Sequence, residues 1–392
     1  MLPLHTHGIV AAPVPALLKV LGIAEALSGA YPPGKVAVDL RDGPEVDATA
    51  LGAAGFAGIV TDGPVERHAV PVHVHSLRDG AVVAPGDVVR VRPGTGMVSN
   101  LFRRGANANT LFATERCNSR CLMCSQPPRD DNDGWRVREM LELVPLLDRD
   151  LPWLGMSGGE PTLLGDGLRE VIGAVATHLP STGLHILTNG RTFADPGALR
   201  WAAPGVGRTV WAVPLYSDVS WRHDHVVQAE GGFDQAVQGI YNLAEAGHRV
   251  EIRMVLHALT VPRLKPFAEF VWRNMPFVDH VALMGLEPMG YAKVNRDQLW
   301  LDPLDYASDL VDAAFHLHDR GIRTSIYNVP LCVLPRAAWP LAQQSISDWK
   351  NTFAPACGGC DVRGRCCGFF ASAGEGWRSR GIKPVNGGHH GG

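Results

Sequence analysis

The feature that most constrains the fold of this 392-residue chain is an alternation of strand-like and helix-like segments that begins near residue 110. Short apolar runs have the length and composition of strands, and amphipathic stretches separate them. The runs are 111–114, 154–157, 184–188, 209–215, 250–256 and 281–286, and the main helical stretches are 136–147, 168–178, 233–246 and 264–272. Six strand–helix units in series predict an α/β fold with a parallel sheet, either partly closed as a partial (β/α)6 barrel or open and doubly wound.

The chain has a different character on either side of this alternation. Residues 1–105 contain short apolar pieces broken by glycine and proline, which predicts a small N-terminal β-rich domain. The partial barrel is expected over 106–325, a cysteine-rich extension over 326–380, and a flexible low-complexity tail over 381–392. This division agrees with the two or three domains expected for a chain of this length.

Composition and charge exclude several classes of protein. The chain is 46% hydrophobic and 19% charged, so it has enough apolar material to fold. Its net charge of −3 provides no broad basic face for nucleic acid. It has no apolar run long enough for a membrane span, and its start lacks the basic region of a secretory signal. We therefore expect a cytoplasmic protein without membrane or nucleic-acid partners, whose reduced cysteines are available as metal ligands.

The first group of cysteines has the spacing C-x3-C-x2-C and follows the first predicted strand. It consists of Cys117, Cys121 and Cys124. Three thiolates on one short loop can hold three irons of a [4Fe-4S] cluster and leave the fourth iron open for substrate chemistry. The alternatives are a zinc knot or three unrelated buried thiols. A structural zinc site needs four ligands, however, and no nearby histidine or fourth cysteine completes this loop.

At this loop the sequence resembles the radical S-adenosylmethionine (SAM) superfamily, and the resemblance extends to about residue 330. The resemblance implies that the three cysteines bind the cluster and that the amino and carboxylate groups of SAM occupy the fourth iron. It also implies that the reduced cluster cleaves SAM to methionine and a 5′-deoxyadenosyl radical, which abstracts a hydrogen from the substrate. One position departs from the family pattern, because Met123 replaces the usual aromatic residue. A thioether can still pack against the adenine ring.

A glycine-rich turn after the second strand resembles the family's site for the SAM amino group. It contains Gly158, Gly159 and Glu160. Glycines allow the backbone to approach a ligand closely, and the carboxylate can accept a hydrogen bond from an ammonium group. By itself such a turn is common between a strand and a helix, but its position one strand after the cysteine loop favours the SAM site.

Polar residues at the carboxyl ends of later strands are further candidates for this site. Asn189 closes the third strand, and Ser217 resembles a position that contacts the ribose or methionine part of SAM. Arg253 is a candidate for gripping the SAM carboxylate, and Glu287 for reaching the adenosine or the substrate. Each is also compatible with a solvated strand end. For residues 223–225, a His-Asp-His sequence, we expect a polar loop above the barrel and no metal site.

The second group of cysteines resembles the shortened auxiliary-cluster extension of peptide-modifying radical SAM enzymes. Cys332, Cys357, Cys360 and Cys366 supply four thiolates, enough for a second iron–sulfur cluster or one zinc ion. The resemblance makes Cys366 the ligand and leaves Cys367 spare. It favours an auxiliary [4Fe-4S] cluster over zinc, and a disulfide is the least favoured in a reducing compartment.

A closer resemblance is to the maturases of the His-Xaa-Ser system, specifically its second radical SAM protein. It rests on residues 113–118, 121–128, 284–288, 347–351 and 366–370. The Ser-Gln-Pro-Pro sequence after the third cysteine is its most specific part. The resemblance implies modification of a ribosomally made polypeptide with His-Xaa-Ser repeats. It also implies a sister radical SAM maturase or small partner protein, and an electron donor of the flavodoxin or ferredoxin type.

Other functions keep part of this pattern. A radical SAM enzyme acting on a small molecule or on RNA would have the same core. A non-catalytic iron–sulfur or zinc scaffold would explain the cysteines, but it would need neither the open-ligand triplet nor the SAM-like turn. If the substrate is a peptide, we expect residues 1–105, or a partner docked on them, to hold it as an extended strand, with 88–91 as a candidate edge. A purely structural β-domain is equally compatible with this region.

Overall fold

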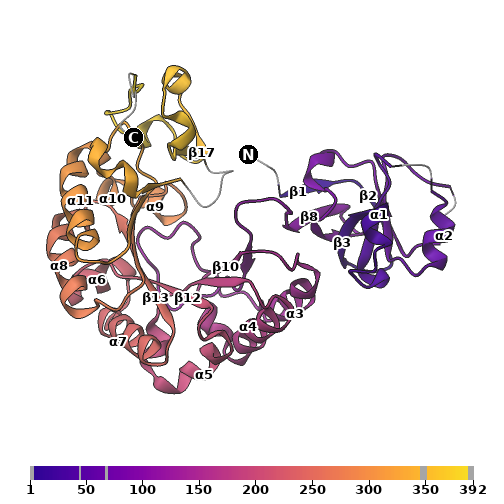
Figure 1. Cartoon of the computed structure of the whole chain (residues 1–392), viewed down its shortest axis with the longest axis horizontal. Coiled ribbons are helices and arrows are strands. Elements are labelled where there is room, and N and C mark those ends of the chain that lie inside the picture. Colours follow the sequence, from indigo (N-terminus) through magenta and orange to yellow (C-terminus); the bar gives the residue numbers. More distant parts are fainter. Residues whose placement is uncertain (1–3, 44–45, 67–68, 345–350, 387–392) are drawn as a thin grey trace. The chain divides into compact units, whose positions relative to one another are not determined.

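The structure is a computed structural model that describes residues 4–43, 46–66, 69–344 and 351–386 (Figure 1). The chain forms two compact units. The first comprises Met1–Leu111, Val137–Leu154 and Gly173–Thr182, and the second comprises Phe112–Arg136, Gly155–Ile172 and Gly183–Gly392. Segments from after residue 136 therefore belong to the same unit as the N-terminal region. Residues 345–350, which carry part of the His-Xaa-Ser resemblance, and 387–392 of the predicted tail lie outside the described residues.

The first unit contains an eight-stranded mixed sheet with the order β1-β8-β7-β3-β4-β5-β6-β2. Its strands are β1 (His5–His7), β2 (Ile9–Ala11), β3 (Ala16–Gly22), β4 (Val36–Asp39), β5 (Gly58–Val60), β6 (Val72–His75), β7 (Val88–Arg92) and β8 (Met97–Phe102). Neighbouring strands from β3 to β6 are parallel, and the other pairs are antiparallel. The single segment 5–11 pairs with β8 through β1 and with β6 through β2. The sheet therefore closes on itself through this segment.

The strand predicted as a docking edge lies inside this sheet. Strand β7, which contains residues 88–91, pairs with β3 on one side and with β8 on the other. Both rows of backbone hydrogen-bonding groups are occupied, so no peptide strand can be added here. The prediction of a docking edge at 88–91 is wrong, because an alternating pattern shows which face is buried but not which strands are neighbours.

Apolar side chains cover both faces of the first sheet. Along β3, Leu18 and Val20 join one core and Leu21 joins the other. Helices α1 (Ile23–Ala26) and α2 (Ala48–Ala53) pack on the second core. Because successive residues of a strand point to opposite faces, burial on both sides produces the continuous apolar runs seen in this region.

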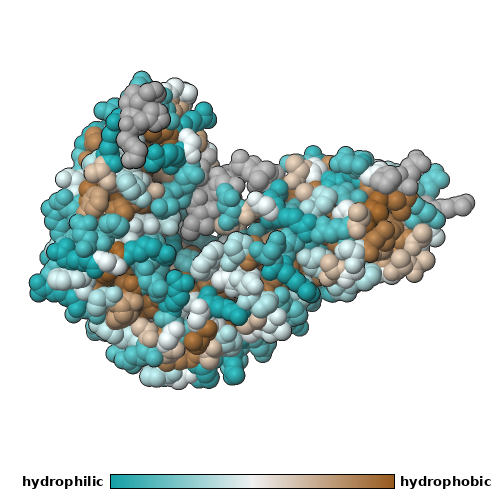
Figure 2. All heavy atoms as spheres, in the orientation of Figure 1, coloured by the Kyte–Doolittle hydropathy of each residue, from teal (hydrophilic) through white to brown (hydrophobic). Residues whose placement is uncertain are grey.

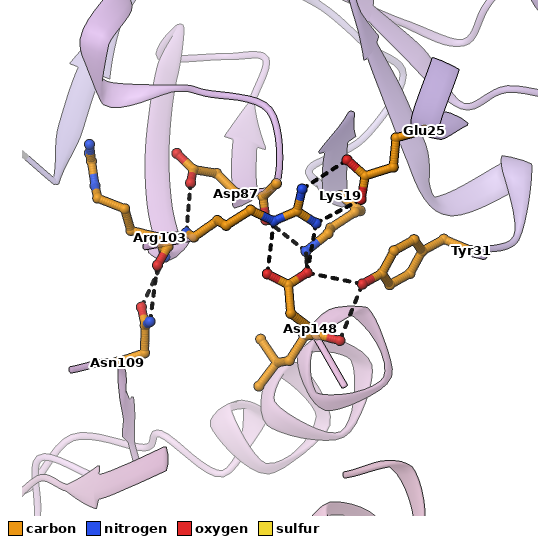
Figure 3. Close-up of polar contacts among 10 residues, drawn as sticks. Lys19, Glu25, Tyr31, Asp87, Arg103, Asn109 and Asp148 are labelled. Carbon is orange, nitrogen blue, oxygen red and sulfur yellow. Dashed lines mark hydrogen bonds and ion pairs between the residues drawn. The ribbon is translucent and has the colours of Figure 1, made fainter. Parts of the chain in front are cut away.

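A buried polar network lies within the first unit (Figure 3). The ammonium group of Lys19, a residue with no exposed surface, donates to Asp148 Oδ1 and to the Gly86 carbonyl oxygen, both at 2.7 Å. The same carboxylate accepts hydrogen bonds from Arg104 and from the Tyr31 hydroxyl. Burial by itself would raise the pKa of Asp148, but the hydrogen bonds from Arg104 and Lys19 outweigh it and hold the pKa at about 2.

The second sheet has eight strands that neighbour one another in chain order from β9 to β16. They are β9 (Thr110–Phe112), β10 (Trp153–Ser157), β11 (Gly183–Leu187), β12 (Thr209–Pro214), β13 (Arg249–Leu256), β14 (His280–Gly285), β15 (Thr324–Tyr327) and β16 (Ala342–Gln343). The pairs from β11 to β16 are parallel. The α/β fold is thereby confirmed, and the consecutive order is that of a singly wound, barrel-like sheet and not of a doubly wound one.

Helices connect these strands, and the four long predicted stretches are helical in the structure (Figure 1). The helices are α3 (Trp135–Leu143), α4 (Asp166–His178), α5 (Leu199–Ala202), α6 (Ser220–Val227), α7 (Gly232–Glu245), α8 (Leu264–Asn274), α9 (Tyr291–Val294), α10 (Arg296–Leu299) and α11 (Pro303–His318). The expectation of a polar loop at 223–225 is wrong, because these residues lie within α6 and His223 is buried.

The cysteine-rich extension has little regular structure. Strand β17 (Asn351–Thr352) pairs antiparallel with β18 (Phe369–Phe370), and short 3-10 turns surround the cysteines. Gly368 has a φ of 63°, and a Cβ there would lie 2.4 Å from the Thr352 carbonyl oxygen. Only glycine therefore fits directly after Cys367.

Figure 2 shows hydrophilic side chains over much of the visible face and apolar ones in several separate patches. Leu27, Trp221 and Val294 are among the most exposed large apolar side chains. Within the described ranges, no helix has the length and apolarity needed to cross a membrane.

Candidate active site

The cysteine loop crosses the carboxyl end of β10 and is held there by backbone hydrogen bonds. The Gly159 amide donates to the Thr114 carbonyl oxygen at 2.6 Å, and the Glu160 amide donates to the Arg116 carbonyl oxygen at 2.8 Å. The residues just before Cys117 thus run against the glycine-rich turn. Two motifs that are more than 30 residues apart in sequence form one local structure.

Gly158 and Gly159 are required by this close approach. Gly158 has a φ of 149°, and a Cβ there would lie 2.6 Å from the Thr114 carbonyl oxygen. A Cβ on Gly159 would lie 2.0 Å from the Arg116 carbonyl oxygen. From the sequence we expect these glycines to admit a ligand, whereas their nearest neighbours in the structure are backbone atoms of the cysteine loop.

The three cysteines of the loop are partly buried. Burial raises the pKa of the Cys117 thiol to about 11, and the nearby Glu160 carboxylate and Cys124 thiol add to this effect. Burial raises the pKa of Cys121 further, with Cys124 and Cys117 adding to it, and burial also raises the pKa of Cys124. Without a metal, these thiols keep their protons, and metal binding would release them.

The segment after β14 packs on the third cysteine. The Tyr291 amide donates to the Cys124 carbonyl oxygen at 2.8 Å, and a Cβ on Gly290, whose φ is 56°, would lie 2.4 Å from the same oxygen. Glu287 is half-buried three residues before Gly290. The structure therefore brings the predicted Glu287 segment to the cysteine loop.

Glu160 has no exposed surface and is already hydrogen-bonded by protein groups. Its Oε1 accepts from the Thr162 amide (3.0 Å), the Thr162 hydroxyl (2.7 Å) and the Thr188 hydroxyl (2.6 Å), and its Oε2 accepts from the Asn189 amide (2.6 Å). A carboxylate accepts about four hydrogen bonds. Protein donors therefore already supply the four hydrogen bonds, and the saturated carboxylate fastens the segment after β10 to the end of β11.

Asn189 also reaches the cysteine loop. Its Nδ2 donates to Asn118 Oδ1 at 2.5 Å, and its side chain is hydrogen-bonded to the Cys117 thiol. The next arginine, Arg191, donates from Nη1 to the Asn118 carbonyl oxygen at 2.5 Å. The sequence reasoning did not single out Arg191, although it lies two residues after the predicted Asn189.

Ser217 follows β12, Arg253 lies within β13, and both have protein partners. Ser217 is 1% exposed, and its hydroxyl accepts from the Val219 amide at 3.1 Å. Arg253 donates from Nη1 to Glu251 Oε1 at 2.7 Å and from Nη2 to the Met284 sulfur at 3.0 Å. Arg253 keeps further N–H groups with which to bind a carboxylate, whereas Ser217 is occupied within its own turn.

A polar cluster on the same sheet was missed by the sequence reasoning. Glu251 Oε2 lies 2.8 Å from His280 Nδ1 and 3.4 Å from His185 Nε2, and His280 Nε2 lies 2.9 Å from the Ser325 hydroxyl. Burial would raise the pKa of Glu251, but hydrogen bonds from His185 and His280 and the charge of Arg253 hold it well below its usual range. The sequence does contain a signal for this cluster, because polar residues occur at every second position of otherwise apolar strands.

Apolar and aromatic side chains border the cysteine loop on another side. Met123, at the position where the family pattern has an aromatic residue, is 6% exposed and belongs to one core cluster with Tyr216 and Leu286. The Tyr216 ring stacks on His223 with centroids 5.8 Å apart. Of the neighbouring polar residues, Asp224 accepts hydrogen bonds from amides at the start of α7. This wall provides an apolar surface next to the thiols.

The four predicted ligands of the second group line one pocket in the extension. Cys332, Cys357, Cys360 and Cys366 all contribute to it, whereas Cys367 faces a different, aromatic-lined pocket. A hydrogen bond from the Cys367 thiol, helped by backbone amides, lowers the pKa of Cys366 to about 6. Cys366 thus shares a pocket with the other three predicted ligands, and Cys367 does not line it.

In the described part of the chain, no three His, Cys, Asp or Glu side chains gather closely enough to hold one metal ion. A four-iron cluster spreads its thiolates more widely than a single zinc ion, which binds sulfur at about 2.3 Å. The thiols of the loop and of the extension pocket have the donor chemistry that an iron–sulfur cluster needs.

No protein-family model matches the chain. Among curated proteins, the mycofactocin maturase MftC of Mycobacterium tuberculosis is 30% identical over 185 residues, which are 44% of this chain and 44% of the relative. The GTP 3′,8-cyclase 2 of the same species is 37% identical over 110 residues, 26% of this chain and 29% of the relative. The Fe-coproporphyrin III synthase of Methanosarcina barkeri is 24% identical over 260 residues, 63% of this chain and 62% of the relative. The alignment with MftC thus spans less than half of that protein.

Among solved structures, SuiB of Streptococcus suis bound to S-adenosylmethionine matches with a TM-score of 0.44 and 16% identity over 55% of this chain and 49% of its own. A tagged anSMEcpe with bound AdoMet matches with a TM-score of 0.44 and 15% identity over 55% of this chain and 60% of its own. The sequence similarities to curated proteins support a radical SAM enzyme. They do not separate its substrate classes, because the relatives named include a maturase, a GTP cyclase and a porphyrin synthase.

Proposed function

We propose that the chain is a radical SAM enzyme that modifies a ribosomally made peptide of the His-Xaa-Ser repeat type. The observation that carries the proposal is the position of the loop that bears Cys117, Cys121 and Cys124, because the residues just before it are hydrogen-bonded to the glycine turn after β10. Three thiolates leave one iron of a [4Fe-4S] cluster without a protein ligand, and that position is free for SAM.

When bound, the cluster and SAM supply a 5′-deoxyadenosyl radical that can take a hydrogen atom from the substrate. The chain's own contribution is to hold the ligands and to exclude water. The apolar wall of Met123 and Tyr216 provides the exclusion. Arg253 and Glu287 are the candidates for direct contact with SAM or the substrate, and Gly158 and Gly159 keep the cysteine loop in place.

We also propose an auxiliary [4Fe-4S] cluster in the extension. Its ligands would be Cys332, Cys357, Cys360 and Cys366, which share one pocket. Four thiolates saturate such a cluster, so its role would be electron transfer and not substrate binding. A flavodoxin- or ferredoxin-type electron donor and a sister maturase or small partner protein would complete the system.

The test begins with anaerobic reconstitution of the full chain with iron and sulfide. We expect two clusters and the formation of 5′-deoxyadenosine from SAM and a reductant. Replacement of Cys117, Cys121 and Cys124 together by alanine should remove about half of the iron and all SAM cleavage, whereas Cys367→Ala should retain both. SAM cleavage by the triple variant would refute the assignment.

The substrate class is tested separately by mass analysis. A synthetic His-Xaa-Ser repeat peptide and GTP are each incubated with the reconstituted chain, SAM and reductant. A SAM-dependent mass change in the peptide supports the proposal. A change in GTP with an unmodified peptide would replace it by a small-molecule substrate, a class that the similarity to the GTP cyclase makes worth testing.

A further inference from the structure

We propose that Arg191 is a positioning residue that places an uncompensated positive charge against the cysteine loop and thereby raises the reduction potential of the cluster bound there. The inference rests on the proposed function, because it concerns the cluster of Cys117, Cys121 and Cys124. It adds a residue outside the cysteine motif and outside the glycine turn.

One guanidinium group ties the cysteine loop to two other elements. Arg191 follows β11, and its Nη1 donates to the Asn118 carbonyl oxygen at 2.5 Å and to the Ser119 hydroxyl at 3.1 Å. Its Nε donates to Gln235 Oε1, on α7, at 2.7 Å. Because Asn118 and Ser119 lie between the first two cysteines, this side chain fixes the part of the loop that orients both thiols.

The charge of Arg191 has no acidic partner in the part of the chain that the structure describes. The three groups that its side chain contacts are neutral, and no carboxylate of the described residues lies within 4.0 Å of its guanidinium. Other arginines of this unit are paired: Arg253 with Glu251, and Arg263 with Asp218.

The position of the Arg191 guanidinium next to the cysteine loop explains why it has no carboxylate partner among the described residues. Arg191 donates to Asn118 and Ser119, which lie between Cys117 and Cys121, so its positive charge lies beside the loop that would hold the cluster. A cluster held by three thiolates is anionic and becomes more negative by one charge on reduction. A nearby cation stabilises the more negative state more, so it favours the reduced cluster. The cluster is thus the anion that this arginine otherwise lacks.

The test compares three variants of the reconstituted full chain. Arg191→Gln removes the charge and keeps hydrogen-bonding capacity, and Arg191→Lys keeps the charge and loses the planar fork. Arg120→Gln is the matched control, because Arg120 is an exposed arginine of the same loop with no side-chain hydrogen bond or ion pair within the described ranges. The cluster is titrated with a reductant and followed by the electron paramagnetic resonance signal that changes when SAM is added.

At the potential that half-reduces the wild-type cluster, we expect the ratio of reduced to oxidised cluster to fall at least three-fold in Arg191→Gln. This corresponds to about 30 mV at 59 mV per tenfold change for one electron. Arg191→Lys and Arg120→Gln should stay close to the wild type. An unshifted Arg191→Gln would overturn the inference, as would a lysine variant shifted as far as the glutamine variant.

Failure of the two proposals can be told apart. If the wild-type chain shows no SAM-sensitive signal, the proposed function fails before any variant is compared. If that signal is present and the ratio does not depend on the charge at residue 191, only the present inference fails. If Arg191→Gln does not retain iron, Arg191→Lys decides the question, because it keeps the positive charge and loses the planar guanidinium. A ratio of reduced to oxidised cluster equal to that of the wild type supports the role of the charge. A lowered ratio overturns the inference.

Discussion

Removal of the Asp148 carboxylate should destabilise the first unit far more than an ordinary surface mutation. In Asp148→Ala, the fully buried ammonium of Lys19 loses its anionic partner at 2.7 Å and keeps the Gly86 carbonyl oxygen and the rings of Tyr31 and Phe102 (Figure 3). Leaving one charge of a buried pair without its partner costs about 3–5 kcal/mol. We expect amide hydrogen exchange in β3 to accelerate about 100- to 4,000-fold, since 1.4 kcal/mol corresponds to a factor of ten.

The control for this prediction is Glu142→Ala in the same unit. Glu142 pairs with Lys35 at 3.3 Å, but both side chains are about half exposed, and such surface pairs contribute about 0–1 kcal/mol. If Asp148→Ala changes exchange in β3 no more than Glu142→Ala does, the reasoning about the buried pair is wrong.

The two partners of the buried pair contribute with opposite signs. Asp148 gains from its hydrogen bonds, whereas burial lowers the pKa of Lys19 and so disfavours its charged form. The joint replacement Lys19→Met with Asp148→Leu removes the unpaired buried charge, so it should recover part of the stability lost in Asp148→Ala.

Three further outcomes follow from the site and from the same network. Gly159→Ala should prevent iron loading of the cysteine loop, because its Cβ would lie 2.0 Å from a carbonyl oxygen, whereas Gly358→Ala, with nothing within 4 Å, should load normally; iron analysis decides. Glu160→Ala leaves buried hydroxyl and amide donors without an acceptor, and at about 1–3 kcal/mol per group it should lower the free energy of unfolding by at least about 2 kcal/mol, measured by denaturant titration. The pKa of Asp148 is about 2 in the folded chain and 3.8 ordinarily, so this carboxylate contributes about 2 kcal/mol of stability above pH 4, and the contribution is lost as the pH falls toward 2. The difference in free energy of unfolding between the wild type and Asp148→Asn should therefore shrink over this range. A constant difference would contradict the assignment.

The second sheet was predictable from the sequence because its signals are local. The six predicted strands lie within two residues of the observed ones, since apolar runs and amphipathic stretches alternate regularly there. Strand β15 was missed because its four residues are followed by an irregular segment, which hides the last units of the sheet. The closure of the first sheet was not predictable either, because it depends on pairing between residues 5–11 and strands that lie far away in sequence.

In the candidate site, too, local features were predictable from the sequence and tertiary contacts were not. The spacing of Cys117, Cys121 and Cys124 is a local pattern, so the sequence identified the loop. The saturation of Glu160 and the contacts of Arg191 depend on side chains from neighbouring strands and helices, which no local pattern encodes. Tertiary contacts therefore decide which polar residues fasten the loop and which remain free to meet a ligand.

The closed sheet of the first unit also imposes an order on its synthesis and folding. His7 pairs with Met97, so the first strand waits for about 90 further residues before its partner exists. At about 5–20 residues per second, the ribosome needs roughly 5–20 s to make that stretch. Strand β6 is complete about 20 residues before β8 begins, so for most of this time the segment that joins β8 and β6 has neither partner, and its backbone groups are open to other chains. Non-local pairing of this kind is slow to form, so the N-terminal segment is the part of the unit whose folding a chaperone would protect most.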